Sequence, residues 1–271
     1  MKNQFFRIKK YLTNTLLILM SSVIFLTGCA ETSDSSTSNS IPGISSSSNT
    51  TSAPSKPKPT KKIAFTFDDG PHKTYTVSIV NELAKYGFNA TFFVVGNRVD
   101  GTAYNGGSAL LYALEKGNEI AIHGYTHKYY YDKCSDEKYN FEISKTLEAI
   151  KSLSPECDVK LMRPIGGSIS KDRINNSPYS VILWNVDTED WKNKYSSGDN
   201  ETQKKNKVDK IVDNVMANVS DGSIILMHDI YESTYDAVKI LLPLLQAEGY
   251  DIVTVSELIG NPKPGTKYNK R

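Results

Sequence analysis

Thr66-Phe67-Asp68-Asp69-Gly70-Pro71 is the stretch from which the rest of the chain can be interpreted. It ends an apolar run, Ile63-Ala64-Phe65-Thr66-Phe67, whose β-branched and aromatic residues predict a buried strand followed by a turn. On an extended backbone the neighbouring carboxylates Asp68 and Asp69 are expected to point to opposite sides and to serve different roles. Asp-Gly and Gly-Pro also favour an ordinary turn, so a functional role for the pair requires partners elsewhere in the chain.

Length, charge and composition limit the kinds of partner. The 271 residues carry a formal net charge of +2, which favours one domain with added segments and indicates no nucleic-acid partner. Hydrophobic residues make up 39% of the chain, which is enough to build a core. We expect the protein to be a monomer.

Residues 1–28 have the pattern of a lipoprotein signal peptide. Basic residues precede a long apolar run, which ends at Leu26-Thr27-Gly28-Cys29. The run approaches the length needed to cross a bilayer, so a plain membrane span is the competing interpretation. The ending resembles a bacterial lipobox, which implies cleavage before Cys29 and acylation of this residue. The acyl chains would anchor the protein in the lipid bilayer, outside the cytoplasmic membrane.

Residues 29–61 are predicted to be a linker, because Ser, Thr, Asn, Pro and Lys dominate and no apolar periodicity is visible. A flexible coil of roughly 30 residues has a root-mean-square reach of about 30 Å. The folded domain is expected over residues 62–258, followed by a polar tail at 259–271.

From residue 62 onward, apolar runs of strand length alternate with stretches of helix length, which predicts a parallel α/β domain. The expected strands are 63–67, 90–95, 119–123, 160–163, 181–186, 223–227 and 251–255. The expected helices are 75–86, 108–116, 136–153, 204–219 and 234–248. About seven strands are few for an eight-stranded barrel, so we expect a distorted or incomplete (β/α) barrel with its active groups at the carboxyl ends of the strands.

Two cysteines, Cys134 and Cys157, flank the helix expected at 136–153. Two cysteines in an exported chain would ordinarily suggest a disulfide. The helix would be about 27 Å long, whereas the Cα atoms of a disulfide lie within roughly 7 Å of each other. We therefore expect no bond between them.

Two motifs with possible ligands follow the third and fourth predicted strands. His123-Gly124-Tyr125-Thr126-His127 offers two imidazoles, which would meet on one face if the chain turned helically there. With Asp69 they suit a catalytic zinc site, although a chance pair in a polar loop is the alternative. Arg163-Pro164-Ile165-Gly166-Gly167 can present a fixed cation and backbone N–H groups to a ligand, or can be an ordinary glycine turn.

The last two motifs carry carboxylates, a tryptophan and a histidine. Asp187-Thr188-Glu189-Asp190-Trp191 follows the fifth predicted strand, and acidic loops of this kind are usually only solvated. Leu226-Met227-His228 ends the sixth strand with a histidine at its tip, where a core role for the imidazole is hard to explain.

The five motifs occur in the order and spacing of those of the NodB-type polysaccharide deacetylases, carbohydrate esterase family 4. This resemblance extends over about residues 62–258. It implies a distorted (β/α) barrel, a bound divalent metal and the removal of acetyl groups from N-acetylated sugars.

By position, the resemblance implies that Asp69, His123 and His127 bind the metal, which we expect to be Zn²⁺, with Co²⁺ or Mn²⁺ as alternatives. Asp68 would be the general base that activates a water molecule. Arg163 would pair with Asp68, and a neighbouring cation keeps such a carboxylate ionised and oriented.

The resemblance also implies which groups surround the substrate. His228 would be the general acid that protonates the leaving amine, with Asp190 raising its pKa. Trp191 would wall the groove and Leu226 would line the acetyl pocket. The Gly166 N–H would join the metal in holding the oxyanion.

Two positions depart from the family pattern. Gly124 stands where Ser or Thr is common, so a hydroxyl that helps to set the metal-binding loop is missing, and weaker metal binding is expected. Ile165 and Gly166 replace the commoner Pro-Tyr, which leaves the shape of the sugar subsite open. The polar insertion 192–207 is expected to be a flexible rim, and its sequence indicates no function.

The chain is therefore interpreted as a lipid-anchored, extracytoplasmic, metal-dependent deacetylase of cell-wall or related glycans, with peptidoglycan N-acetylglucosamine as the expected target. An O-acetyl esterase that acts on xylan through the same residues is the nearest alternative. A catalytically inactive glycan-binding lipoprotein is a second alternative, disfavoured because the metal ligands and His228 are all present.

Overall fold

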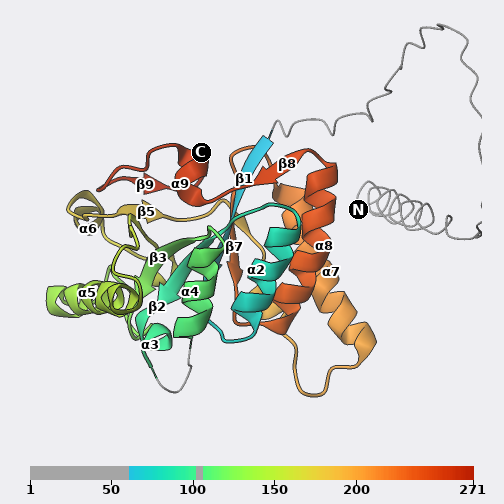
Figure 1. The fold of residues 1–271 in the computed structure, drawn as a ribbon, viewed down its shortest axis with the longest axis horizontal. Helices are drawn as coiled ribbons and strands as arrows, with labels where there is room; N and C mark the ends of the chain where they lie inside the picture. The colour runs from blue at the N-terminus through green and yellow to red at the C-terminus, as the bar shows by residue number, and fades with distance from the viewer. Residues whose placement is uncertain (1–60, 102–105) are drawn as a thin grey trace, which may run out of the picture. The chain divides into compact units, whose positions relative to one another are not determined.

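The computed structural model describes residues 61–101 and 106–271, which form a curved sheet with helices packed against it (Figure 1). The strands are β1 (Lys61–Asp68), β2 (Thr91–Val95), β3 (Glu119–Gly124), β4 (Leu161–Met162), β5 (Ser180–Ile182), β6 (Val186–Asp187), β7 (Ile224–His228), β8 (Tyr250–Ile252) and β9 (Lys267–Tyr268). The helices are α2 (Tyr75–Lys85), α3 (Gly96–Val99), α4 (Gly107–Glu115), α5 (Asp136–Leu153), α6 (Lys171–Asn175), α7 (Glu201–Asn218), α8 (Glu232–Ala247) and α9 (Val255–Ile259). Two 3₁₀ turns, η1 (Ile165–Gly167) and η2 (Asp190–Lys192), follow β4 and β6.

The sheet is an incomplete barrel, as the sequence predicts. Its strands follow the order β6-β7-β1-β2-β3-β4-β5-β9, and β8 pairs with the beginning of β1. All pairings between these strands are parallel. Within the described ranges the outermost strands, β6 and β9, are not paired with each other, so the sheet does not close by hydrogen bonds.

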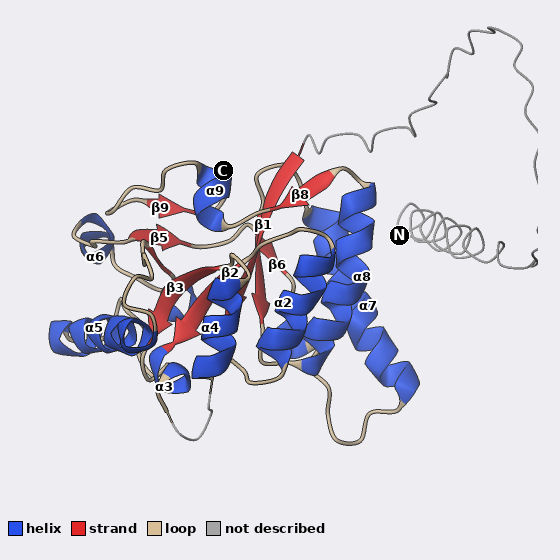
Figure 2. Cartoon of the chain, viewed as in Figure 1, coloured by secondary structure: helices blue, strands red, loops and turns tan. Residues whose placement is uncertain are grey.

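The strands are buried on both faces, which explains their nearly unbroken apolar runs. Along β1, Ile63, Phe65 and Phe67 belong to the larger hydrophobic cluster, to which α2, α4, α5, α7 and α8 also contribute. Ala64 points to the other face and belongs to a second cluster with Val255 of α9. Figure 2 shows the long helices packed along the sheet, as expected where helices connect parallel strands.

Helix α5 begins and ends where the sequence predicts. Ser135 caps its first turn by accepting a hydrogen bond from the Lys138 N–H, and Asp136 lies in that first turn, where a negative charge is favourable. Cys134 and Cys157 lie beyond the two ends of α5 and are both free.

Helix α7 begins at Glu201, three residues before the predicted start. Asn200 and Gln203 form a reciprocal capping box that starts the helix there. The insertion 192–207, expected to be a flexible rim, therefore contains the first two turns of α7. Lys207 also pairs with Asp199 at 2.5 Å, which ties the preceding loop to the helix.

The prediction of one strand at 181–186 is wrong. The segment is divided into β5, which pairs with β4 and β9, and β6, which pairs with β7 near the other end of the strand order. Between them the carbonyls of Ile182 and Leu183 accept hydrogen bonds from the Arg163 side chain. Because the chain from Ile182 to Val186 can span about 14 Å at most, it holds the two ends of the curved sheet close together.

The residues predicted to be a polar tail also belong to the fold. The Val181 N–H donates to Thr266 O at 2.9 Å and the Leu183 N–H donates to Tyr268 O at 2.7 Å, so β9 covers the edge of β5. A strand with a lysine and few apolar residues is typical of a sheet edge, which is why hydrophobicity alone does not predict it.

The predictions for the signal peptide at 1–28, for Cys29 and for the linker up to residue 60 lie outside the described residues. Lys61, expected as the last linker residue, is instead the first residue of β1. In the part of the chain that the structure describes, no helix has the length and apolar character needed to cross a membrane.

A chain that ends at Gly260 is expected to be less stable by about 2–4 kcal/mol, because the two hydrogen bonds between β9 and β5 and the packing of Tyr268 are lost. Urea unfolding followed by circular dichroism measures this difference. A chain that ends at Tyr268 keeps β9 and is expected to retain most of the stability. Equal midpoints for the Gly260-ended chain and the full chain would contradict the role assigned to β9.

Candidate metal centre and active site

The predicted site residues come together at the carboxyl ends of the central strands. Asp68 ends β1 and His228 ends β7. His123 is the next-to-last residue of β3, and Arg163 directly follows β4. Asp68 and His228 are opposite each other in the parallel pairing of β1 with β7. Four segments spread over about 160 positions of the chain thus meet at one edge of the sheet.

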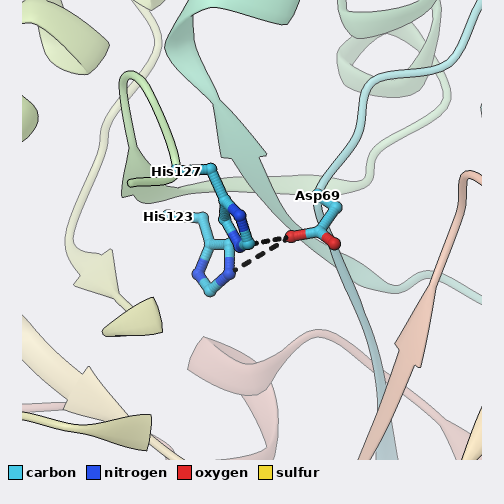
Figure 3. Close-up of side chains that lie close together, drawn as sticks. All are labelled: Asp69, His123 and His127. Atoms are coloured by element: carbon cyan, nitrogen blue, oxygen red, sulfur yellow. Dashed lines mark ion pairs between the residues drawn. The ribbon is translucent and has the colours of Figure 1, made fainter. Parts of the chain in front are cut away.

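Asp69, His123 and His127 form a compact group of potential metal ligands (Figure 3). The Asp69 Oδ1 atom lies 2.9 Å from His127 Nε2 and 3.4 Å from His123 Nε2. One ligand atom from each residue lies within 4.8 Å of the other two. Two imidazoles and one carboxylate are the ligand set of many catalytic zinc sites, which keep a further position for water or substrate.

The hydrogen bonding of His123 fits a cation at this point. His123 Nδ1 lies 2.8 Å from the Arg163 carbonyl oxygen, an acceptor, so Nδ1 carries the proton and Nε2 of the neutral ring presents a lone pair. That lone pair faces Asp69 Oδ1, a buried oxygen that accepts no hydrogen bond from the described residues. Acceptors that converge in this way need a positive charge between them, which a divalent metal would supply.

Without a metal, a proton on His123 Nε2 would face the same carboxylates, and the pKa shifts of the metal-free group have this cause. Burial alone would raise the pKa of the Asp69 carboxyl, but His123 and His127 outweigh burial and hold that pKa below its ordinary range. Burial opposes protonation of His123, but Asp68 and Asp69 outweigh it and raise the pKa of the imidazole above its usual value.

The four-residue spacing suggests that the two histidines meet through a helical turn, but the structure shows a different conformation. Gly124 has a φ of 105° and His127 a φ of 59°, so the chain leaves β3 through left-handed conformations. These conformations bring the two rings to a centroid distance of 5.2 Å. A side chain at Gly124 would be strained by the φ angle alone.

The expectation that Asp68 and Asp69 point to opposite sides is also wrong. Asp69 has a φ of 71°, which ends the extended backbone of β1 and turns its carboxylate toward the histidines. The Asp68 Oδ2 atom lies 3.7 Å from His123 Nε2, compared with 3.4 Å for Asp69 Oδ1. The two carboxylates therefore share one imidazole, and their roles differ through their other partners.

Arg163 is the other partner of Asp68. Its guanidinium is fully buried and Nη1 donates to Asp68 Oδ1 at 2.7 Å and to Thr66 Oγ1 at 2.8 Å. The ring of Phe93 lies against the guanidinium at 4.1 Å. A buried guanidinium that donates to Oδ1 fixes the orientation of the Asp68 carboxylate and of its remaining lone pairs.

His228 pairs with Asp190 in η2. His228 Nδ1 lies 2.8 Å from Asp190 Oδ1, and the His228 backbone N–H donates to Asp190 Oδ2 at 2.7 Å. The Thr234 hydroxyl donates to the same buried carboxylate, at 2.7 Å. Burial opposes the charged imidazole, but Asp190 outweighs burial and raises the pKa of His228 to about 9. This leaves Nε2 as the nitrogen that can donate a proton.

The remaining predicted residues differ in exposure. Leu226 is buried two residues before His228 on the same face of β7, whereas Trp191 is exposed beside Asp190. Gly166 has a φ of 59°, and a Cβ placed on it would lie 2.8 Å from Cε1 of Tyr130, an exposed aromatic residue that the sequence did not indicate. The ring of Tyr130 therefore occupies the space beside this glycine.

A cavity of about 220 Å³ opens beside Asp69 and His127. Asn97 and Arg98 of α3 line it together with Val95 and Thr126. Sequence reasoning missed Asn97 and Arg98. Their position directly after β2, at the carboxyl end of a central strand, is the signal that could have indicated them.

Asp229 is another residue of the site that the sequence analysis did not indicate. It is fully buried next to His228, and burial raises the pKa of its carboxyl to about 7, while a hydrogen bond from Thr76 opposes this shift. A Cβ on Gly70 would lie 2.3 Å from either oxygen of Asp229, so the glycine of the Asp68–Pro71 turn is needed for close packing.

Comparison with known proteins gives one consistent family. A family model described as polysaccharide deacetylase matches residues 55–178. The chain is 35% identical over 205 residues to the peptidoglycan-N-acetylglucosamine deacetylase PgdA of Listeria monocytogenes, covering 76% of this chain and 40% of the relative. It is 34% identical over 211 residues to a peptidoglycan-N-acetylglucosamine deacetylase of Bacillus cereus, covering 75% of this chain and 90% of the relative.

A solved structure agrees with these matches. The peptidoglycan deacetylase PdaC of Bacillus subtilis has a TM-score of 0.65 at 36% identity, with 74% of this chain and 90% of the other covered. The chain spans less than half the length of the Listeria relative, whereas it covers most of the Bacillus cereus protein.

The pairing of His228 with Asp190 predicts a shifted titration. In the metal-free protein, His228 is expected to titrate near pH 9, above the ordinary histidine value of 6.5. In the Asp190→Asn variant its pKa is expected to fall by about one unit or more, because the opposing charge is gone. NMR titration of the imidazole measures both values.

The stabilising effect of this pair has a defined pH range. Since the folded pKa is raised, the contribution is complete below about pH 6.5 and is lost as the pH rises through about 9.

Asp187→Asn, in the same segment but exposed, is the matched control and is expected to leave the His228 titration unchanged. Titration of His228 near pH 6.5 in the unmodified protein would contradict the pairing.

Proposed function

Because the chain belongs to the polysaccharide deacetylase family, we propose that it is a metal-dependent deacetylase that hydrolyses N-acetyl groups of peptidoglycan N-acetylglucosamine. One observation carries the proposal. The ligand group of Asp69, His123 and His127 lies beside a carboxylate oriented by a buried arginine and beside a histidine that pairs with Asp190. Hydrolysis of an amide needs these three functions: activation of water, stabilisation of charge and protonation of the leaving amine.

The metal would be held by Asp69, His123 and His127, and we propose Zn²⁺. When bound, a divalent metal acts as a Lewis acid and lowers the pKa of water. The carbonyl of Arg163 holds the His123 ring in the tautomer that leaves Nε2 free for the metal.

Asp68 would act as the general base. Arg163 occupies Oδ1 of this carboxylate, so Oδ2, on the side of His123, is the oxygen that can accept a proton from the attacking water. The ion pair with Arg163 holds the buried Asp68 carboxylate in a fixed orientation. The base is therefore oriented before the substrate binds.

His228 would act as the general acid. A raised pKa keeps the imidazole protonated at neutral pH, and the Asp190 contact at Nδ1 leaves Nε2 to protonate the departing amine. The Gly166 N–H would donate to the oxyanion, Leu226 would contact the acetyl methyl group and the exposed Trp191 would support the sugar ring.

The substrate and location are parts of the same proposal. The Listeria monocytogenes and Bacillus cereus relatives carry the name peptidoglycan-N-acetylglucosamine deacetylase, which supports peptidoglycan as the target. The Leu26–Cys29 sequence supports acylation of Cys29 and a position outside the cytoplasmic membrane, where peptidoglycan lies.

Substitution of Asp68 tests the function. The purified protein, loaded with Zn²⁺ or Co²⁺, is expected to release acetate from peptidoglycan, and Asp68→Asn is expected to lower kcat by about 10²–10⁴-fold, because the general base is lost. Asp209→Asn, on the surface of α7, is the matched control. Chelation of the metal is expected to abolish the activity, and added Zn²⁺ to restore it.

The choice of substrate distinguishes the alternatives. Chitooligosaccharides and acetylated xylan are assayed beside peptidoglycan. Acetate release from xylan alone would indicate an O-acetyl esterase. Equal release by the unmodified protein and Asp68→Asn on all three substrates would show that the protein is not an enzyme of this kind.

A further inference from the structure

Glu142 is a charged residue of α5 whose side chain is fully buried. Its Oε2 atom accepts hydrogen bonds from the Tyr125 N–H at 2.6 Å and from the Thr126 N–H at 2.8 Å. Its Oε1 atom accepts a hydrogen bond from the Thr126 hydroxyl. Within the described residues, the hydrogen bonds to this carboxylate thus come from two consecutive residues of one loop.

These two residues lie between His123 and His127. The connecting chain has a positive φ at Gly124 and at His127, and at His127, which is not a glycine, such a conformation persists only where the surroundings hold it. Helix α5 packs directly against β3, and Glu142 is the side chain through which it binds the loop. A carboxylate that accepts three hydrogen bonds can fix both the direction of the loop and the position of the second imidazole.

The packing around Gly124 leaves no space for a side chain at this position. A Cβ at this position would lie 2.5 Å from Tyr131 Oη and 3.0 Å from Glu142 Oε2. A serine or threonine hydroxyl at position 124 could not support the loop unless Tyr131 and Glu142 moved. Support from Glu142 and a side chain at position 124 are therefore alternatives, and this chain has Glu142.

We propose that Glu142 is a positioning residue for the metal centre: by binding Tyr125 and Thr126 it holds His127 in place to bind the metal together with His123 and Asp69. The inference rests on the proposed function, because it concerns the same metal. It replaces the expectation that the absence of a hydroxyl at Gly124 weakens metal binding. The loop keeps its support, but from a helix that contains none of the family motifs.

The test is the affinity of the whole protein for Zn²⁺, measured by competition with a chromogenic chelator in the absence of substrate. Glu142→Ala is expected to bind Zn²⁺ about 10–100-fold more weakly, the usual effect of losing a residue that orients a ligand. Glu142→Gln is expected to retain most of the affinity, because the amide oxygen can accept the two N–H groups and its NH₂ can donate to the Thr126 hydroxyl. The visible spectrum of bound Co²⁺ should change in Glu142→Ala and not in Glu142→Gln.

Thr146→Ala is the matched control on the same helix. Thr146 is buried one turn further along α5 and donates to the Glu142 carbonyl. Alanine at this position removes buried packing but leaves the loop hydrogen bonds intact. It is expected to lower stability without lowering the affinity for Zn²⁺. If Glu142→Ala does not fold, Thr126→Val provides the second test, since it removes only the hydroxyl contact and is expected to weaken Zn²⁺ binding to a smaller extent.

Two outcomes separate this inference from the proposed function. If Glu142→Ala, or Thr126→Val in its place, binds Zn²⁺ as tightly as the unmodified protein, the inference is wrong, whatever the enzymatic activity. If the unmodified protein binds Zn²⁺ and the variants bind it weakly, but no acetate is released from any glycan, the inference holds and the proposed function fails.

Discussion

The buried ion pair between Arg163 and Asp68 connects the parts of the molecule that must act together. A guanidinium without contact to solvent is costly unless its N–H groups find acceptors, and here Asp68, Thr66 and the carbonyls of Ile182 and Leu183 accept hydrogen bonds from it. The same residue offers its own carbonyl to His123 Nδ1. One residue thus orients the base through its side chain, binds the carbonyls where β5 ends, and sets the tautomer of a metal-ligand candidate through its backbone carbonyl.

Three of the four carboxylates of the site pair with different basic side chains, and this difference gives similar residues different functions. Asp68 has Arg163, Asp69 has the two imidazoles and Asp190 has His228. Asp229 has only hydroxyl and backbone contacts, and burial raises its pKa to about 7. The environment, and not the residue type, therefore decides which carboxyl pairs with a basic side chain and which has a raised pKa.

The sequence predicts the repeating elements and the motif residues well, because these depend on local patterns. Helix α5 has a capping serine and a regular apolar face, and β1 is an apolar run that ends in a turn. Long-range contacts decide the features that the sequence does not reveal. The division of 181–186 depends on Arg163, the turn of Asp69 on its left-handed conformation, and the burial of Glu142 on a loop encoded earlier in the chain. Glu142 does share the buried face of α5 with Thr146 and Ala149, so a charge on an apolar face was the available signal.

The direction of the parallel strands also determines where the two described ends of the domain lie relative to the candidate site. Lys61 starts β1 and Asp68 ends it, so the chain enters the domain about 25 Å from the catalytic edge, at the strand's opposite end. The last residue, Arg271, bonds to Gly222, just before β7, and therefore also lies away from that edge. Both described ends of the domain therefore lie opposite the edge that carries the candidate site, which leaves that edge free of chain ends for a large substrate.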